Sequence, residues 1–240
     1  MPMPADFLAS FRESMPLSYR QQQNPDDIRE HALIAWRRGD EPVHAEIWST
    51  RLNAVVVCVV ADDRPGLPSL IRATVAAHGF DVVAAQNYCR YNERQRPEAI
   101  HLLWLSPSLE GQRGPANEQD VTSIAQSVSA LLRGQTDLGS VIERASSIPS
   151  SPGASIDVST TEDVESDGAI LLTVDAANRE ELLEKIASVL STKQVKVLSS
   201  DRTVSGSRAQ CRFHIVESDG SALSQDRVRA IAATVQRALE

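Results

Sequence analysis

Aromatic and basic side chains are scarce in this sequence, and the scarcity excludes several classes of function. Aromatic residues make up 4% of the 240 residues, and the formal net charge at pH 7 is -8. Stacking on single-stranded nucleic acid needs exposed aromatic rings, and binding to a phosphate backbone or an anionic lipid surface needs clustered Lys and Arg. We therefore expect no nucleic acid and no membrane among the partners of this chain.

Long apolar runs and paired cysteines are absent as well. The sequence has no run of about 18 apolar residues, as a transmembrane helix would need, and its amino terminus lacks the basic start and apolar stretch of a signal peptide. Cys58, Cys89 and Cys211 lie in apolar or alternating segments, and none belongs to a CxxC motif. Free thiols buried in a reducing compartment explain this pattern, so we expect a cytoplasmic protein.

Catalytic and metal-binding patterns are missing too. The five histidines show no metal-ligand spacing such as HxxxH, and the chain has no His-Asp dyad, P-loop, dinucleotide-binding turn or Ser-His-Asp arrangement. We therefore expect no catalytic residue, no metal and no cofactor. Histidines such as His101 are interpreted as partly buried structural residues.

The most informative feature that is present is an internal repeat. The order strand, helix, strand, strand, helix occurs twice, because short apolar runs alternate with stripes of helical period. In the first half the segments are 53–61, 67–78, 80–90, 98–105 and 121–132. In the second half they are 169–174, 182–190, 195–204, 208–216 and 228–239, preceded by a short strand at 155–160.

Shifts in composition mark the borders of the repeats. We predict a first module at 52–134 and a second at 155–240, joined by a linker at 135–154 that contains most of the stretch "SSIPSSPGAS". Residues 1–51 are expected to form an N-terminal helical or extended segment, in which Asn24 caps a helix.

This order of elements indicates an α+β protein whose modules each have an antiparallel sheet with the helices on one face. A module of about 80 residues buries only a small core. The open sheet faces and edges should therefore pack against the other module or a second chain, and we expect a homodimer.

At the turn "ADDRPGLPSLI" (61–71), followed by "GFDVVAAQNYCR" (79–90), the sequence resembles the ACT family of small-molecule regulatory domains. It looks most like the paired ACT domains at the carboxyl end of bacterial PII uridylyltransferases, nitrogen sensors that respond to glutamine. The resemblance covers residues 16–240 and is stronger in the first half. A spaced pattern ahead of the first module matches as well: Pro16, Tyr19, Pro25, Ile28 and His31.

The resemblance implies two ferredoxin-like modules of βαββαβ order, an amino-acid ligand such as glutamine, and regulation of a partner protein. The nucleotidyltransferase and phosphohydrolase domains of those enzymes have no counterpart in this sequence. We therefore expect a non-catalytic protein without nucleotidyl transfer or phosphohydrolase activity.

The candidate ligand site is the strand-to-helix turn of the first module. Its residues are Asp62, Asp63, Arg64, Pro65, Gly66 and Leu67. A glycine lets a ligand approach the main chain closely, and the unpaired N–H groups at the start of the next helix attract a carboxylate. Either aspartate would accept a hydrogen bond from the ligand's ammonium group. The alternative is a plain turn in which Asp63 caps the helix.

Asn87 is a further candidate, because polar groups of that strand lie near the binding turn in ACT pairs; the alternative is an amide that faces water. In the second module the turn reads Asn178-Arg179-Glu180-Glu181-Leu182, so the glycine is missing. The two glutamates would repel a carboxylate ligand. We therefore interpret the second module as structural.

These patterns predict a regulatory sensor that binds a small ligand and relays its occupancy to an unidentified partner protein. Three alternatives remain: a paired-ACT transcriptional modulator, a ligand-free interaction scaffold, and a regulatory subunit of a separately encoded amino-acid enzyme.

Overall fold

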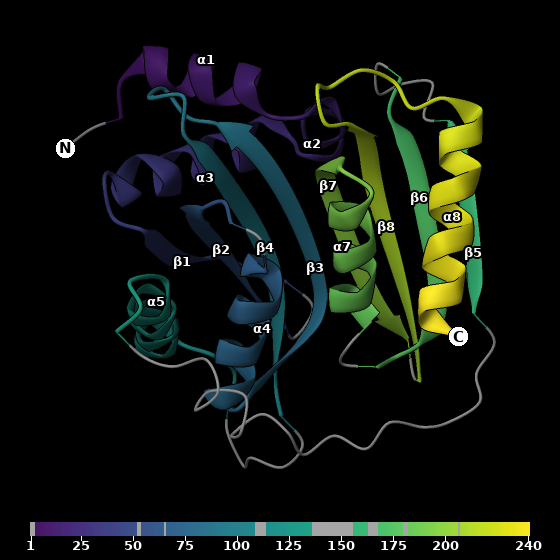
Figure 1. Ribbon diagram of the computed structural model, residues 1–240. Coiled ribbons are helices and arrows are strands. Elements are labelled where there is room, and N and C mark those ends of the chain that lie inside the picture. Colours follow the sequence, from purple (N-terminus) through teal and green to yellow (C-terminus); the bar gives the residue numbers. More distant parts are fainter. Residues whose placement is uncertain are drawn as a thin grey trace. The chain divides into compact units, whose positions relative to one another are not determined.

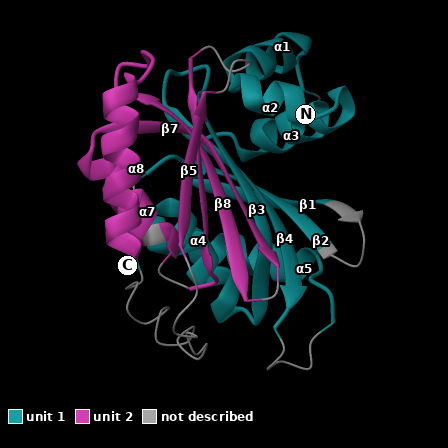
Figure 2. Ribbon diagram, turned by 90° about the vertical axis from the view of Figure 1, so that its right-hand side faces the viewer, with its two compact units in different colours: residues 1–148 teal, residues 149–240 magenta. Residues whose placement is uncertain are grey.

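The computed structural model of the chain divides into two compact units, residues 1–148 and 149–240 (Figure 2). The parts of the chain that it describes are residues 3–51, 54–64, 66–108, 114–135, 156–162, 168–179, 182–205 and 207–240. The linker predicted at 135–154 lies outside these parts, apart from residue 135.

The first unit consists of helices and strands in the following order. They are α1 (Ala5–Ser14), α2 (Leu17–Gln22), α3 (Pro25–Arg38), β1 (Val43–Arg51), β2 (Ala54–Asp62), α4 (Leu67–Ala77), β3 (Phe80–Tyr91), β4 (Pro97–Pro107) and α5 (Glu118–Leu132). The second unit has β5 (Asp157–Glu162), β6 (Ile170–Ala177), α7 (Leu182–Thr192), β7 (Val195–Ser205), β8 (Arg208–Glu217) and α8 (Gln225–Leu239).

The strands of each unit pair in an antiparallel manner (Figure 1). The strand order is β1-β2-β4-β3 in the first unit and β5-β6-β8-β7 in the second. The predicted α+β class with antiparallel sheets is confirmed. From β1 in the first unit and from β5 in the second, the described elements follow the order strand, strand, helix, strand, strand, helix, so the outer strand beside β2 or β6 comes first. In a βαββαβ module it would come last.

The internal repeat extends to the details of strand pairing. The register of β3 against β4 shifts between Val82 and Ala84, and the register of β7 against β8 shifts between Val197 and Ser199. A β-bulge of this kind bends and twists a strand at a chosen point. Because the bulge lies at the same place in both repeats, positions of β3 and β7 can be matched one to one.

Helices cover both faces of the first unit's sheet (Figure 1), because the N-terminal helices α1 to α3 lie on the face opposite α4 and α5. The helices α4 and α5 pack on the face that carries Val57 and Val59. The helices α1 to α3 pack on the face that carries Cys58 and Val60. The physical reason is that β2 is buried at every position from 55 to 61, and a strand that is apolar at successive positions needs cover on both faces.

In the second unit the helices α7 and α8 share one core with the sheet face that carries Val174, Cys211 and Phe213. The neighbouring positions on the other face include polar residues such as Thr173 and Arg212, so these strands alternate as the sequence predicts. None of the described helices combines the length and the apolarity needed to cross a bilayer.

The helix α3 begins and ends where the sequence predicts. The Asn24 side chain accepts a hydrogen bond from the Asp27 amide at 2.9 Å, and Gly39, with φ of 56°, follows the last turn. Ile28 and Ala32 recur at a spacing of four and are buried in the core formed with the sheet.

The helix α5 begins with a reciprocal capping box. The Asn117 side chain accepts hydrogen bonds from the backbone amides of Gln119 and Asp120, and the Asp120 carboxylate accepts one from the Asn117 amide. Three helix-terminal donors are satisfied in this way.

We expect Asn117→Ala to lower the free energy of unfolding of the first unit by about 1 kcal/mol, because Ala cannot accept these bonds. Urea unfolding followed by tryptophan fluorescence measures the change, since all three tryptophans belong to this unit. Asn117→Ser is the control and should retain most of the stability. If Asn117→Ser lowers the free energy of unfolding as much as Asn117→Ala does, the side-chain acceptor does not stabilise the start of α5.

Candidate functional site

The turn between β2 and α4 has the backbone geometry that the candidate site requires. Gly66 has φ of 80° and ψ of 0°, and α4 starts directly after it without a side-chain cap. A Cβ atom placed on Gly66 would meet no atom of the described residues within 4 Å, apart from its chain neighbours, so the space in front of this residue is open with respect to them. The backbone angle, rather than crowding, is what favours glycine here. Pro65 lies outside the described residues.

The two aspartates of the turn have different surroundings. The Asp62 carboxylate forms an ion pair with the Arg38 guanidinium. Asp63 is half-buried, and its amide donates to the Pro97 carbonyl at 3.1 Å. Within the described residues its carboxylate has no hydrogen-bond or ion-pair partner, and it does not cap α4. Asp63 is therefore the aspartate that can receive a ligand's ammonium group.

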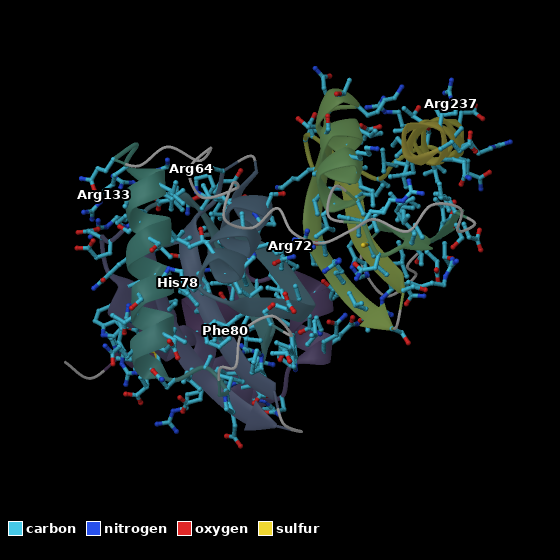
Figure 3. The ribbon with its side chains drawn as sticks, turned by 90° about the horizontal axis from the view of Figure 1, so that it is seen from below. Arg64, Arg72, His78, Phe80, Arg133 and Arg237 are labelled. Atoms are coloured by element: carbon cyan, nitrogen blue, oxygen red, sulfur yellow. The ribbon has the colours of Figure 1, made fainter. Side chains whose placement is uncertain are left out.

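Arg64 and Leu67 hold the turn in place. Arg64 Nη1 donates to the Leu132 carbonyl at 2.8 Å, and this carbonyl belongs to the last residue of α5. A cation at the carboxyl end of a helix is favourable, and Figure 3 shows Arg64 and Arg133 near the same end of α5. Leu67 is buried in the core between α4, α5 and the sheet. Both residues contribute to the shape of the site through packing and anchoring.

Asn87 pairs with a buried histidine that the sequence pattern did not single out as a site residue. In the strand register Asn87 lies opposite His101, and the Asn87 Oδ1 accepts a hydrogen bond from His101 Nδ1. His101 is 2% exposed, and burial lowers its pKa to about 4, so the imidazole is neutral at pH 7. Its Nε2 has no hydrogen-bond partner in the described part of the chain.

The register also tells which face of the sheet this pair occupies. His101 lies two residues from Ala99 and two from Leu103, and both of these belong to the core under α4 and α5. Because side chains alternate along a strand, His101 and Asn87 share that face. A signal was present in the sequence: a polar residue at an inward position of an otherwise apolar strand.

A cluster of buried charges on the other face was not predicted. Glu98 accepts hydrogen bonds from Arg38 Nη1 and Arg90 Nε, both at 2.6 Å, and Arg38 also binds Asp62. The side chains of Arg38, Arg90 and Glu98 are at most 4% exposed. We call these four residues the Arg38 cluster. Its members are spread over 61 positions of the chain, from 38 to 98, so no local pattern reveals it.

The second unit has a polar residue at the place of Asn87. Five positions after the start of the bulge, where β3 carries Asn87, β7 carries Arg202, which is 4% exposed. Arg202 Nη2 donates to Asn178 Oδ1 at 2.5 Å, and Asn178 belongs to the turn before α7. In this unit a protein cation therefore occupies the space next to the turn. Glu180 and Glu181 lie outside the described residues.

A shallow concavity lies beside the turn of the second unit. Its lining consists of Ile156, Ala176, Ala177, Arg179, Leu182, Lys185 and Leu239. Lys185 is the fourth residue of α7, and the fourth residue of α4 in the first unit is Leu70, which packs against the core there. No group of three His, Cys, Asp or Glu residues in the described parts of either unit is arranged to hold a metal ion.

Comparison with known proteins shows similarity to part of an enzyme. A bifunctional uridylyltransferase/uridylyl-removing enzyme of Phenylobacterium zucineum (strain HLK1) is 23% identical over 235 residues, which cover 94% of this chain and 24% of the enzyme. The chain therefore spans about a quarter of the length of this relative and is similar to one segment of it. No protein-family model matches the sequence.

Two solved structures show weak likeness. A protein of unknown function from Galdieria sulphuraria has a TM-score of 0.23 and 15% identity, covering 78% of this chain and 91% of its own. The fused permuted hexameric shell protein of the RMM microcompartment has a TM-score of 0.25 and 11% identity, covering 90% and 92%. Scores this low support no argument about fold or function.

Proposed function

We propose that this chain is a non-catalytic regulatory sensor whose units are diverged ferredoxin-like modules of the ACT type. The first unit binds an amino acid such as glutamine at the turn from Asp62 to Leu67 and relays its occupancy to a partner protein. The observation that carries the proposal is the open helix start after Gly66, with the Asp63 carboxylate beside it and without a partner among the described residues.

The chemistry of a free amino acid suits this arrangement. Its carboxylate accepts hydrogen bonds from backbone amides at the start of α4, where the helix dipole favours negative charge. Its ammonium group donates to Asp63, since Asp62 is bound to Arg38. The neutral His101 and its partner Asn87 supply polar groups on the face of the sheet that α4 and α5 cover. The similarity to a segment of a uridylyltransferase supports the link to nitrogen metabolism.

We also propose that the chain is cytoplasmic, forms a homodimer and acts on a partner protein. Among the described strands, β1 and β5 each pair with a single neighbour, and open edges favour pairing with another chain. Light scattering distinguishes a defined dimer from a monomer. The ligand-free scaffold is the second candidate, because Arg64 and Leu67 already have structural roles.

A thermal-shift screen with the twenty amino acids separates the two candidates. A ligand at 100 times its dissociation constant stabilises the folded protein by about 2.7 kcal/mol. A sensor should respond to one or a few amino acids, and a scaffold should respond to none.

We expect Gly66→Val to reduce the affinity for L-glutamine at least about tenfold, because a β-branched residue resists positive φ and places methyl groups in the open space. Asp63→Ala should weaken binding by about 1.5–3 kcal/mol through loss of a charge-assisted hydrogen bond. Calorimetric titration measures both effects.

The matched control is Glu181→Ala, at the equivalent of Gly66 in the second unit, which should leave the affinity nearly unchanged. Because Asp63 does not cap α4, Asp63→Ala should also leave the unfolding free energy nearly unchanged. An equal loss of affinity from Glu181→Ala, or full affinity in a folded Gly66→Val protein, would place the site elsewhere.

A further inference from the structure

The Arg38 cluster connects the candidate turn to the helices on the opposite face of the sheet. Asp62, the last residue of β2, is its member next to the turn. The Asp62 side chain is 39% exposed, while the other three are almost fully buried. The Asp62 amide donates to the Pro42 carbonyl at 3.0 Å, and the following amide, of Asp63, donates to Pro97. These bonds anchor the end of β2, and Asp62 is the last strand residue before the turn, so a displacement of the turn reaches its partly exposed carboxylate first among the members of the cluster.

The other members hold two helices against the sheet. Arg38 is the last residue of α3. Arg90 Nη1 donates to Ser14 Oγ at 3.0 Å, at the end of α1, and the Arg90 guanidinium lies 4.5 Å from the centre of the Phe11 ring. One connected set of ion pairs and contacts thus reaches from the turn to α1 and α3.

The stability of the Arg38 cluster depends on the position of Asp62, because Asp62 supplies one of its two negative charges. With Asp62 in place, two guanidinium groups face two carboxylates, and Glu93 contacts Arg90 at 3.4 Å from the exposed side. Without it, the buried Arg38 and Arg90 share the single buried carboxylate of Glu98. Buried charges that lack a partner are strongly unfavourable in a region of low dielectric constant. Arg38, and α3 with it, is therefore held more weakly when Asp62 moves away.

We propose that the pair of Asp62 and Arg38 transmits ligand occupancy of the turn to α1 and α3, which are the output elements of the first unit. This inference rests on the proposed function, since it assigns the route by which occupancy leaves the site. Arg38 acts as a positioning residue, because it contacts the turn through Asp62 and does not contact the ligand.

Hydrogen exchange of the amides in α3 tests the route, with L-glutamine as the probe. In the wild-type chain, saturating L-glutamine should slow exchange in residues 25–38 by about tenfold, which corresponds to about 1.4 kcal/mol of coupling. Arg38→Met keeps the volume of the side chain and leaves Glu98 paired with Arg90. Its affinity for L-glutamine should stay within about threefold, but the response of α3 should disappear.

The matched control is Arg37→Met on the same helix. The Arg37 side chain is 50% exposed and forms its ion pair with Glu46, which is not a member of the cluster. This variant should keep both the affinity and the response of α3.

A second arm needs no ligand. Gly66→Ala strains the turn at φ of 80° and should accelerate exchange in α3 of the wild-type chain, with no further acceleration in the Arg38→Met background. A failure of L-glutamine to bind counts against the proposed function. The ligand-free comparison of Gly66→Ala in the two backgrounds then tests the route from the turn to α3 by itself. An α3 that responds equally in wild-type and Arg38→Met proteins, or in neither, overturns the inference even when L-glutamine binds.

Discussion

Glu98→Ala is expected to lower the free energy of unfolding of the first unit by about 3–5 kcal/mol, because it leaves two buried arginines without their shared acceptor. Glu98 accepts hydrogen bonds from Arg38 and Arg90 at 2.6 Å each, and all three side chains are at most 4% exposed. Urea unfolding monitored by tryptophan fluorescence measures the loss in this unit alone, since the second unit contains no tryptophan.

The control for this prediction is an exposed ion pair of the same unit. Asp40 pairs with Arg94, and their side chains are 70% and 60% exposed. Asp40→Ala should change the unfolding free energy by no more than about 1 kcal/mol, because solvent screens exposed pairs. If Glu98→Ala costs as little as Asp40→Ala, the cluster does not hold the helices to the sheet.

The second large effect expected is a loss of stability in mild acid. Burial lowers the pKa of His31 to about 3 and that of His101 to about 4. Between pH 4 and 6.5 the unfolded chain therefore binds up to two protons more than the folded chain, so the free energy of unfolding falls as the pH falls. At pH 5 the loss is about 2 kcal/mol for each histidine, and about 4 kcal/mol in total, relative to neutral pH.

A non-titrating variant separates this cause from the titration of carboxylates. His101→Gln should remove about half of the histidine-dependent slope between pH 4 and 6.5, measured as urea midpoints over that range. An unchanged slope in this variant would show that His101 is already protonated in the folded protein.

Local patterns in the sequence determined much of the architecture. The alternation of strand-like runs with helical stripes predicted the repeated order of elements, because the periods of 2 and 3.6 residues follow from backbone geometry alone. The start of α3 at Asn24 and the turn conformation of Gly66 could also be read from the sequence, since capping and positive φ depend on one or two neighbouring residues.

The tertiary structure decided which partner each polar side chain meets. The sequence predicts Asp62 as a possible ligand contact in the turn, but in the fold its carboxylate binds Arg38, 24 residues earlier in the chain. Glu98 meets Arg38 across 60 positions, and His101 meets Asn87 through strand register. Periodicity predicts which residues are buried, but ion pairs and hydrogen bonds depend on which faces and strand ends come together. The pair of Asn87 and His101 exists only once the sheet has formed, and the contacts of Arg38 also require that α3 covers its second face.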